Sequence, residues 1–503
     1  MRHINTPIML FTFCVLVFAS LANARPIAQS DPEDILRSWV EVINAGDATQ
    51  YEPFIREHFA PRLIEAYPMS DHVGMFEEIR SDYGTLTLHS IRTQTDDRIA
   101  GLIHTEQDQW LLVTLYVDPE SGKLRGVGLD DGVDSPDVMD APKATDLDSW
   151  SQSIQAYASG RAEKDQFSGT LLMQLDGQEV TQGVWGEASK RYHVPNNLDT
   201  KFNLGSMNKM FTAVCIAQLV QAGKLSYEDL VGKHLPDYPN SEVREKVTIH
   251  HLLSHTSGMG SHFTPEFIES AKDRYRDFHT YVDLFADTEL AFEPGERFSY
   301  SNAGFFVMGL IIEALSDETY YEYVRTNLTG PAGMTNTDCY DLDLPVPNLA
   351  TGYTQQQFDE PEREDHADWM DALGSWRANT LMHSVKGGPA GGGYSTVRDL
   401  GLFAKALTDG TLINAKQLKI LTTPSMPVEP GGDGSTRGYG YGFGCGTLAN
   451  GTAYFGHSGG FPGINSVLHI YPERNGFATA MSNYDGGASP IVSHAERVMP
   501  EQK

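Results

Sequence analysis

The chain has 503 residues, of which 40% are hydrophobic, and its 67 acidic and 37 basic residues give a formal net charge of −30 at pH 7. A chain of this length exceeds one ordinary hydrophobic core, so we expect more than one domain. The negative charge argues against nucleic acids and anionic membranes as partners, because polyanions are bound by basic patches. We expect the charge to serve solubility.

Residues 1–24 predict a secretory signal peptide. A basic start at Arg2 and His3 precedes an apolar run over residues 8–21, and small residues ending at Ala24 form a cleavage site. The competing interpretation is a retained membrane anchor, but the run is shorter than the roughly 20 residues that a spanning helix needs. We therefore expect cleavage after Ala24, no membrane span in the mature chain, and a periplasmic or secreted protein.

Residues 31–131 predict a small α+β domain. Apolar residues recur at helical spacing from Ile35 to Ile43, and again from Val73 to Ile79. Segments that alternate with period two then indicate successive strands, over residues 86–91, 98–105, 110–117 and 124–129. This order resembles the NTF2-like cone fold. The resemblance implies a binding or dimerising module rather than a second enzyme.

A linker and a larger domain are expected to follow. Residues 132–146 are rich in Asp, Pro and small residues, which is typical of a linker. From residue 147 to 503 we expect a helix, two strands around residues 167–175 and 179–186, a mostly helical middle, and strands again after about Gly438. Strands from both ends of this segment predict one sheet that is flanked by helices and interrupted by a helical insert.

The cysteines favour no extensive disulfide framework. Removal of the leader leaves Cys215, Cys339 and Cys445, which is an odd number for an exported protein. One disulfide between Cys339 and Cys445 and three buried thiols are the alternatives that the sequence leaves open.

The first chemical motif pairs Ser206 with Lys209 at the start of an apolar helix that Gly223 ends. The spacing of i and i+3 places both side chains on one helix face, so the amine can take the hydroxyl proton. The free N–H groups and the positive end of the helix dipole lie beside the serine. Alone, the pattern S-x-x-K also fits a capping serine with a solvated lysine.

A second motif, Tyr300-Ser301-Asn302, precedes another strongly apolar helix. A phenol there can carry protons if a nearby ammonium lowers its pKa, and an amide can hold a substrate carbonyl. The same Y-x-N pattern at residues 238–240 lies in a proline-rich loop, and we interpret it as a coincidence.

Near the C-terminus, residues 456–460 read Gly-His-Ser-Gly-Gly and match the nucleophile-elbow pattern G-x-S-x-G. An elbow needs a following helix and further βα units, whereas Pro462-Gly463 and a strand-like segment follow here. We therefore predict an edge strand that serves a nucleophile elsewhere in the chain, with Ser458 as a wall of that site.

Taken together, S-x-x-K, Y-x-N and His457-Ser458-Gly459 stand in the order of the three motifs of the serine β-lactamase and penicillin-binding protein family. The segments at residues 247–259 and 387–407 resemble its class C-like branch, which also holds D-aminopeptidases, DD-carboxypeptidases and family VIII esterases. The resemblance covers residues 147–498. It implies a β-lactamase/transpeptidase-like fold, an antiparallel sheet flanked by helices with a helical subdomain.

The resemblance also implies roles for the motif residues. Ser206 would be the acylated nucleophile, with Lys209 and Tyr300 as the proton-handling pair. The backbone N–H groups of Ser206 and Gly460 would form the oxyanion hole. The remaining expected contacts are Asn302 with a substrate amide, His457 with the substrate and Tyr300, and Ser458 and Gly459 along the edge strand.

Several functions within this family stay open. We expect a secreted serine hydrolase that cleaves esters or amides through an acyl-enzyme, with a small ester, a D-amino-acid peptide or a peptidoglycan fragment as substrate. His457 in place of the usual lysine favours esters and D-amino-acid amides as substrates. Weak β-lactamase activity is a further alternative. A non-catalytic cell-wall or penicillin-binding sensor is the alternative from another class.

Two further features have simpler explanations. His251 and His255 have the spacing of a zinc helix, but Leu252 replaces the Glu of H-E-x-x-H, so we expect a structural helix end, no metal and no cofactor. The acidic segment at residues 358–371 is expected to border the cleft and repel anionic substrates, or else to be a solvated loop.

Overall fold

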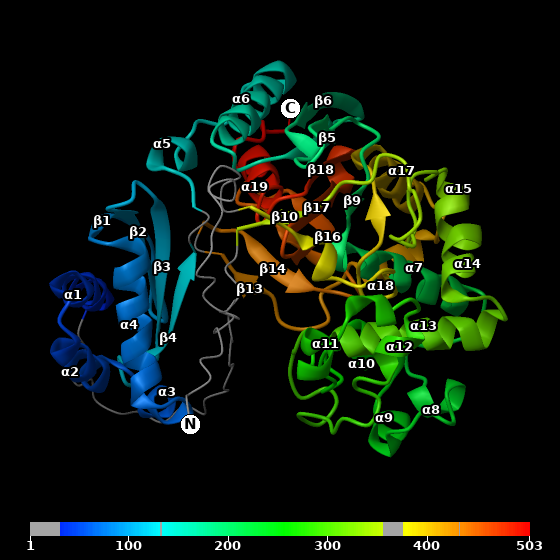
Figure 1. The fold of residues 1–503 in the computed structure, drawn as a ribbon, viewed down its shortest axis with the longest axis horizontal. Helices are drawn as coiled ribbons and strands as arrows, with labels where there is room; N and C mark the ends of the chain where they lie inside the picture. Colours follow the sequence, from blue (N-terminus) through cyan, green and yellow to red (C-terminus); the bar gives the residue numbers. More distant parts are fainter. Residues whose placement is uncertain (1–30, 131–132, 356–375, 432, 503) are drawn as a thin grey trace. The chain divides into compact units, whose positions relative to one another are not determined.

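The computed structural model describes residues 31–130, 133–355, 376–431 and 433–502 (Figure 1). The chain divides into two compact units between Val138 and Met139, a point that lies inside the predicted linker. The predicted signal peptide and the acidic segment at residues 358–371 lie outside the described residues. Among the helices that are described, none is both long and apolar enough to span a bilayer.

The smaller unit begins with helices. Asp31 caps the first of them by accepting a hydrogen bond from the backbone N–H of Glu33 at 3.0 Å, and Gly46, with φ of 62°, ends it. Its buried face includes Leu36 and Trp39, as the helical spacing predicts. The helices of this unit are α1 (Pro32–Ala45), α2 (Ala48–His58), α3 (Pro61–Ala66) and α4 (Met69–Tyr83).

An antiparallel sheet follows, and in the described residues it has four strands in the order β1-β2-β3-β4. They are β1 (Leu86–Thr95), β2 (Arg98–Thr105), β3 (Trp110–Val117) and β4 (Leu124–Asp130). Every second residue of β3, from Leu111 to Val117, is buried against the helices. The α+β order thus matches the expectation, whereas the NTF2-like assignment stays a prediction.

The larger unit is built on an antiparallel sheet that the described residues form with eight strands, in the order β13-β14-β15-β16-β17-β18-β5-β6. Its strands are β5 (Gly169–Leu175), β6 (Gln178–Trp185), β13 (Glu429–Pro430), β14 (Thr436–Tyr439), β15 (Gly444–Thr447), β16 (Ala453–Phe461), β17 (Ile464–Tyr471) and β18 (Gly476–Ser482). Figure 1 shows β18 and β5 side by side although they come from opposite ends of the unit. The prediction of one sheet from both chain ends is confirmed.

Helices cover both faces of this sheet. On one face, α6 (Leu147–Glu163) and α19 (Ser489–Arg497) pack together, and the indole of Trp150 donates a hydrogen bond to the Ala495 carbonyl at 2.8 Å. On the other face lie α7 (Asn208–Gln221), α17 (Val397–Thr408) and α18 (Ala415–Leu421). In β5, Leu171 and Met173 face α6 while Leu172 faces the other core, as the strand period requires.

The helical insert lies between β6 and β13. Its helices are α8 (Val231–His234), α9 (Ser241–Lys246), α10 (Ile249–Leu253), α11 (Pro265–Glu269), α12 (His279–Val282), α13 (Asn302–Ser316), α14 (Tyr320–Val324) and α15 (Gly330–Ala332). Four short helical turns also lie between β6 and β13 in the described residues: η1 (Gly205–Met207), η2 (Lys272–Arg274), η3 (Arg325–Thr329) and η4 (Asn379–Leu381). Two further short elements lie elsewhere in the chain, α5 (Pro136–Met139) and η5 (Pro472–Arg474). Two-stranded ribbons are formed by β7 (Glu187–Ser189) with β8 (Val194–Pro195), β9 (Phe202–Asn203) with β12 (Tyr394–Ser395), and β10 (Tyr353–Thr354) with β11 (Arg377–Ala378).

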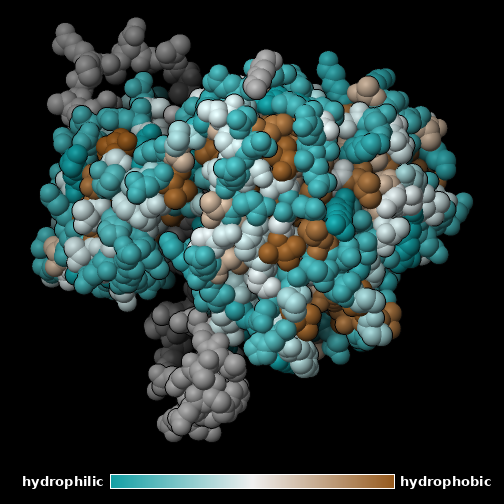
Figure 2. Space-filling model, turned by 90° about the horizontal axis from the view of Figure 1, so that it is seen from above, coloured by the Kyte–Doolittle hydropathy of each residue, from teal (hydrophilic) through white to brown (hydrophobic). Residues whose placement is uncertain are grey.

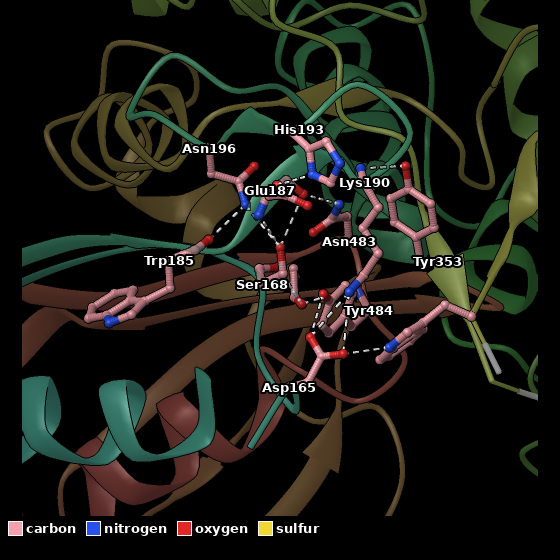
Figure 3. Close-up of polar contacts among 12 residues, drawn as sticks. Asp165, Ser168, Trp185, Glu187, Lys190, His193, Asn196, Tyr353, Asn483 and Tyr484 are labelled. Atoms are coloured by element: carbon pink, nitrogen blue, oxygen red, sulfur yellow. Dashed lines mark hydrogen bonds and ion pairs between the residues drawn. The ribbon is translucent and has the colours of Figure 1, made fainter. Parts of the chain in front are cut away.

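A polar network fastens the ends of β5 and β18 to the neighbouring loops (Figure 3). Asp165 accepts hydrogen bonds from the Tyr484 hydroxyl at 2.8 Å and from the Trp376 indole at 2.6 Å, and the Lys190 ammonium lies 3.2 Å away. Because Asp165 is engaged by Tyr484, Trp376 and Lys190, which come from separate segments, we interpret its role as structural.

The described cysteines are thiols, and the face of the larger unit seen in Figure 2 is mainly hydrophilic. Cys215, Cys339 and Cys445 are buried and unpaired, so of the two alternatives the three thiols are present. Figure 2 shows that hydrophilic residues dominate the visible face of the larger unit and that its hydrophobic patches are small and separated.

Candidate active site

Ser206 lies in the turn η1, directly before α7, and Lys209 follows one helical turn later. The Lys209 amine nitrogen lies 3.2 Å from the Ser206 hydroxyl, as the i, i+3 spacing predicts. The helix α7 is buried on nearly every side, so this lysine enters the protein core rather than solvent. The usual explanation of S-x-x-K, a capping serine with a solvated lysine, therefore does not apply.

Lys209 has no solvent-exposed surface, and this burial holds the pKa of its amine well below the ordinary value. Besides Ser206, its nitrogen lies 2.7 Å from Oδ1 of Asn302 and 2.6 Å from the Ala390 carbonyl. A neutral amine has two N–H groups and one lone pair. The carbonyl and the amide oxygen accept the two N–H groups, so the lone pair faces the hydroxyl of Ser206.

The orientation of Asn302 follows from its second contact. Its Nδ2 donates a hydrogen bond to the hydroxyl of Ser261 at 3.1 Å, which leaves Oδ1 to accept from Lys209. Asn302 is the first residue of α13, whose N-cap Ser301 accepts from the backbone N–H of Gly304. The motif thus starts a buried helix and directs its asparagine to the lysine.

Tyr300 lies on the other side of the nucleophile. Its hydroxyl forms a hydrogen bond with Ser206, and its ring lies 4.8 Å from the Lys209 nitrogen. The residue as a whole keeps 41% of its surface exposed, yet desolvation of the hydroxyl raises the pKa of this phenol above its ordinary value. Tyr300 is therefore a neutral hydrogen-bond donor, whereas a nearby ammonium would have lowered its pKa.

Glycines allow the edge strand and a Gly-rich turn to approach the nucleophile closely. A β-carbon on Gly459 would lie 1.9 Å from the Leu204 carbonyl oxygen, and one on Gly205 would lie 2.9 Å from the backbone nitrogen of Gly460. The Gly392 amide donates to the Gly205 carbonyl at 3.3 Å. The amide nitrogen of Gly460 thus comes close to the serine loop, where the expected oxyanion hole requires it.

The structure brings His457 near Tyr300 as expected, with ring centroids 6.4 Å apart, but leaves it out of the cavity wall. It is only 9% exposed, and it is not among the residues that line the cavity beside Ser206. Its Nε2 lies 3.0 Å from the Tyr439 hydroxyl, and its Nδ1 donates to the Ser458 carbonyl at 2.5 Å. Burial, with Lys209 nearby, lowers the pKa of His457 to about 4, so the ring is neutral at pH 7.

The cavity beside the nucleophile encloses about 90 Å³. Of the predicted site residues, Ser206, Asn302 and Gly460 line it, whereas Ser458 and Gly459 do not. Its remaining wall is mainly aromatic, formed by Phe263, Phe267, Tyr281, Phe306 and Phe461 with the imidazoles of His262 and His383. This small aromatic space can receive a compact, apolar group next to the reacting carbonyl.

His262 gives this wall a polar group. The residue is 8% exposed, and desolvation lowers its pKa to about 3. In the part of the chain that the structure describes, its buried Nδ1 has no hydrogen-bond partner. The imidazole is therefore neutral, and it adds no charge to the cavity.

Sequence reasoning missed several residues of this site. His255, Tyr439, His262 and the Ala390 carbonyl all contact or surround the motif residues. The available signals were the segments at residues 247–259 and 387–407, which contain His255 and Ala390 and resembled the family without indicating roles for these residues.

The two histidines with zinc-like spacing are engaged separately. The Nδ1 of His251 accepts a hydrogen bond from the backbone N–H of Thr248 at 3.2 Å, within the first turn of α10. His255 bonds instead to Tyr439 and to the Ser301 amide. The described residues contain no cluster of three or more side chains that could hold a metal ion. In the other Y-x-N pattern, Asn240 caps α9.

Comparison with known proteins agrees with these motifs. The family model described as Beta-lactamase matches residues 154–500. Penicillin-binding protein 4* of Bacillus subtilis (strain 168) is 28% identical over 358 residues, which cover 69% of this chain and 75% of that protein.

Solved structures show the same fold. A penicillin binding protein from Bacillus halodurans has 31% sequence identity and a TM-score of 0.60, and the match covers 68% of this chain and 99% of that one. A D-stereospecific amidohydrolase from Streptomyces sp. has 25% identity and a TM-score of 0.56, over 69% of this chain and 98% of that one. The chain therefore belongs to the β-lactamase family and is a serine hydrolase of that family.

Proposed function

We propose that the chain hydrolyses uncharged esters and amides through an acyl-enzyme on Ser206. The observation that carries this proposal is the hydrogen-bond pattern of Lys209. Both N–H groups of its neutral amine are used by Asn302 and Ala390, so its lone pair faces the Ser206 hydroxyl. An amine whose pKa is lowered by burial is the general base that a serine nucleophile needs near neutral pH.

In acylation, the Lys209 amine takes the proton of Ser206 while the serine oxygen attacks the substrate carbonyl carbon. The negative charge that develops on the carbonyl oxygen is stabilised by the backbone N–H groups of Ser206 and Gly460. The Tyr300 phenol donates its proton to the leaving oxygen or nitrogen, and it is reprotonated from the Lys209 ammonium. The leaving alcohol or amine departs, and the amine of Lys209 is neutral again.

In deacylation, a water molecule replaces the leaving group beside Tyr300 and Lys209. The amine takes one proton from this water, whose oxygen attacks the acyl carbon. The bond between the acyl group and Ser206 breaks, the serine oxygen recovers a proton from the ammonium, and the carboxylic acid leaves. Each proton taken up is thus returned within the cycle.

The cavity supports an uncharged and compact acyl group as substrate. Its aromatic wall favours apolar groups, and burial keeps His262 and Lys209 neutral. His457, with both nitrogens engaged, offers no cation to a substrate carboxylate. The similar Streptomyces protein is named a D-stereospecific amidohydrolase, and on that ground we extend the proposal to D-amino-acid amides, which carry no carboxylate.

Replacement of Ser206 by Ala tests the assignment. We expect Ser206→Ala to lose at least about 10³-fold in kcat on p-nitrophenyl butyrate, because the nucleophile of covalent catalysis is removed. The matched control is Ser458→Ala, the serine of the G-x-S-x-G pattern, which should keep activity within about tenfold of the unchanged chain because that serine contacts no reacting atom in this mechanism. Loss of activity in Ser458→Ala alone would make Ser458 the nucleophile.

The same preparation ranks the substrate classes. Assays with p-nitrophenyl butyrate, nitrocefin and a D-Ala-terminated peptide should give the highest kcat/KM for the uncharged ester, because the other two carry carboxylates. Covalent labelling of Ser206 by penicillin without turnover of any substrate would instead favour a binding protein.

We also propose that the protein is exported, to the periplasm or the medium, and that the N-terminal unit forms a dimer. The leader pattern at residues 1–24 and the resemblance of the N-terminal unit to a dimerising module support these proposals. N-terminal sequencing of the exported protein should give Arg25 as its first residue, and an uncleaved Met1 would contradict the leader.

A further inference from the structure

A chain of hydrogen bonds connects the Y-x-N motif to the third motif through two residues outside the motifs. The Ser301 amide donates to Nδ1 of His255 at 3.0 Å. Nε2 of His255 lies 3.1 Å from the Tyr439 hydroxyl, which in turn lies 3.0 Å from Nε2 of His457. The other nitrogen of His457, Nδ1, lies 2.5 Å from the Ser458 carbonyl oxygen.

The two ends of this chain fix the direction of every bond in it. A backbone amide can only donate, so Nδ1 of His255 accepts and the proton of this neutral ring is on Nε2. That proton is donated to the Tyr439 oxygen, whose own proton is then donated to Nε2 of His457. At the other end a carbonyl can only accept, so Nδ1 of His457 carries the proton. The two ends require the same tautomer of His457.

His255 also holds the segment that carries Tyr300. The Ser299 amide donates to the His255 carbonyl at 2.8 Å, and the Ser301 amide donates to its ring, so bonds on both sides of Tyr300 end on one residue. The centroids of the His255 and Tyr300 rings are 4.2 Å apart. His255 adopts φ of 58°, a left-handed conformation that is uncommon for residues other than glycine and clusters at functional sites.

We propose that His255 and Tyr439 are positioning residues of this hydrolase, which together hold Tyr300 against Ser206 and lock His457 in the Nδ1–H tautomer. The proposal rests on the proposed function, because it concerns the same site. In the locked tautomer, both nitrogens of His457 are occupied. His457 is then a neutral neighbour of Tyr300, β16 supplies the Gly460 amide, and proton transfer is left to Lys209 and Tyr300.

Burial is the main reason that His457 is neutral, with Lys209 second, and the hydrogen bond that Tyr439 donates to Nε2 further stabilises the unprotonated ring. The titratable groups that surround His457 are Lys209 on α7, His255 after α10, Tyr300, Tyr439 on β14 and His469 on β17, which is paired with Glu496 of α19. Protonation of His457 would place a second cation near Lys209. That cation would disfavour the ammonium which forms when Lys209 takes the serine proton.

Tyr439→Phe tests this proposal, because it keeps the ring and removes only the hydroxyl. Burial and Lys209 still lower the pKa of His457 in this variant, but loss of the donor to Nε2 should raise that pKa from about 4 by up to roughly one unit, since a hydrogen bond contributes about 1 kcal/mol. The acidic limb of the pH profile of kcat/KM for p-nitrophenyl butyrate should then lie up to roughly one pH unit higher in the variant than in the unchanged chain.

Tyr441→Phe is the matched control. Tyr441 lies two residues further along, and its hydroxyl bonds to Nδ1 of His250 rather than to the chain that reaches His457. The control should keep the pH profile of the unchanged protein. A Tyr439→Phe profile that coincides with the unchanged one would overturn the proposal, whereas the proposed function stands or falls separately on the loss of activity in Ser206→Ala.

A measurement on the unchanged chain keeps the proposal testable if Tyr439→Phe fails to fold. Nitrogen-15 NMR of the histidine-labelled full-length protein near neutral pH should show one Nδ1–H imidazole whose signal disappears in His457→Gln. A His457 signal from the Nε2–H tautomer, or from a protonated ring, would contradict the direction of the hydrogen bonds and overturn the proposal.

Discussion

At the scale of single residues, the chemistry of this site depends on a lysine that burial keeps uncharged. Among the residues that the structure describes, the Lys209 nitrogen bonds to a serine, an asparagine and a backbone carbonyl, and to no carboxylate. Burial of a charged amine without an opposite charge is unfavourable, so the folded state favours the neutral form. The same cost that makes Lys209 a base should therefore appear as a pH-dependent penalty on folding.

We expect Lys209→Met to show this penalty. Because the pKa of Lys209 is lower in the folded than in the unfolded chain, the unfolded chain binds more protons, and stability falls as the pH falls below the unfolded pKa. Met carries no such proton. As the pH falls from about 10 to about 7, the free energy of unfolding of the variant minus that of the unchanged chain should therefore increase by up to about 1.4 kcal/mol for each pH unit.

Urea unfolding of both proteins at several pH values measures this difference, and p-nitrophenyl butyrate hydrolysis should be lost in the variant at all of them. Loss of the hydrogen bonds to Asn302 and Ala390 changes the stability of the variant by the same amount at every pH. Only the change of the stability difference with pH therefore reports on the charge of Lys209. A difference in stability that does not change over this pH range would show that Lys209 is charged in the folded protein.

At the scale of elements, the edge strand β16 and the turn η1 approach each other so closely that a side chain between them is excluded. A β-carbon on Gly459 would overlap the Leu204 carbonyl, two residues before the nucleophile. The glycine at position 459 of the third motif is thus required by packing against the serine loop. The G-x-S-x-G pattern arises from this packing and not from a nucleophile elbow.

We expect Gly459→Ala to displace the serine loop. Overpacking of this kind costs roughly 1–3 kcal/mol, and kcat/KM on p-nitrophenyl butyrate should fall by more than about tenfold because Ser206 shifts away from the Gly460 amide. Gly160→Ala is the control. It lies within α6, where an added β-carbon meets nothing within 4 Å, so it should add roughly 0.5–1 kcal/mol of stability and leave activity unchanged. Unchanged activity in Gly459→Ala would contradict the close approach.

The elements that the sequence predicts well are those with strong periodicity. The strands β2 and β3 begin and end at the predicted residues, because polar turns bound both of them. Burial alternates along β3, whereas residues 99–103 of β2 are all buried. The helices α2 and α3 were not predicted, because α2 contains Pro53 and α3 buries no residue, which removes the periodic signal. Periodicity depends on a buried face, so short or exposed helices give little of it.

The site was predictable only where local spacing fixes geometry. Ser206 and Lys209 meet because they are one helical turn apart. The contacts of Tyr439 with His255 and His457 join a strand to segments 184 and 18 residues away, so no local pattern could indicate them. The location of His457 outside the cavity wall likewise depends on which face of β16 is buried, which the strand pairing decides.

At the scale of the whole molecule, the two units have separate hydrophobic cores. The core of the smaller unit consists of residues from Ile35 to Leu124, and the cores of the larger unit consist of residues from Trp150 to Met499. The residues that line the cavity all lie between Asn203 and Ile464. Each core thus closes within its own unit, and the candidate site is complete within the larger one.

We therefore expect a chain that begins at Met139 to fold and to hydrolyse p-nitrophenyl butyrate with kcat/KM within about twofold of the full-length protein, since compact domains with their own cores fold alone. If the smaller unit dimerises as proposed, light scattering should give twice the chain mass for the full-length protein and a monomer for the shortened one. An insoluble or inactive shortened chain, beside an active full-length protein, would show that the larger unit depends on residues before Met139. A monomeric full-length protein would contradict the proposed dimer but not the prediction that the larger unit folds alone.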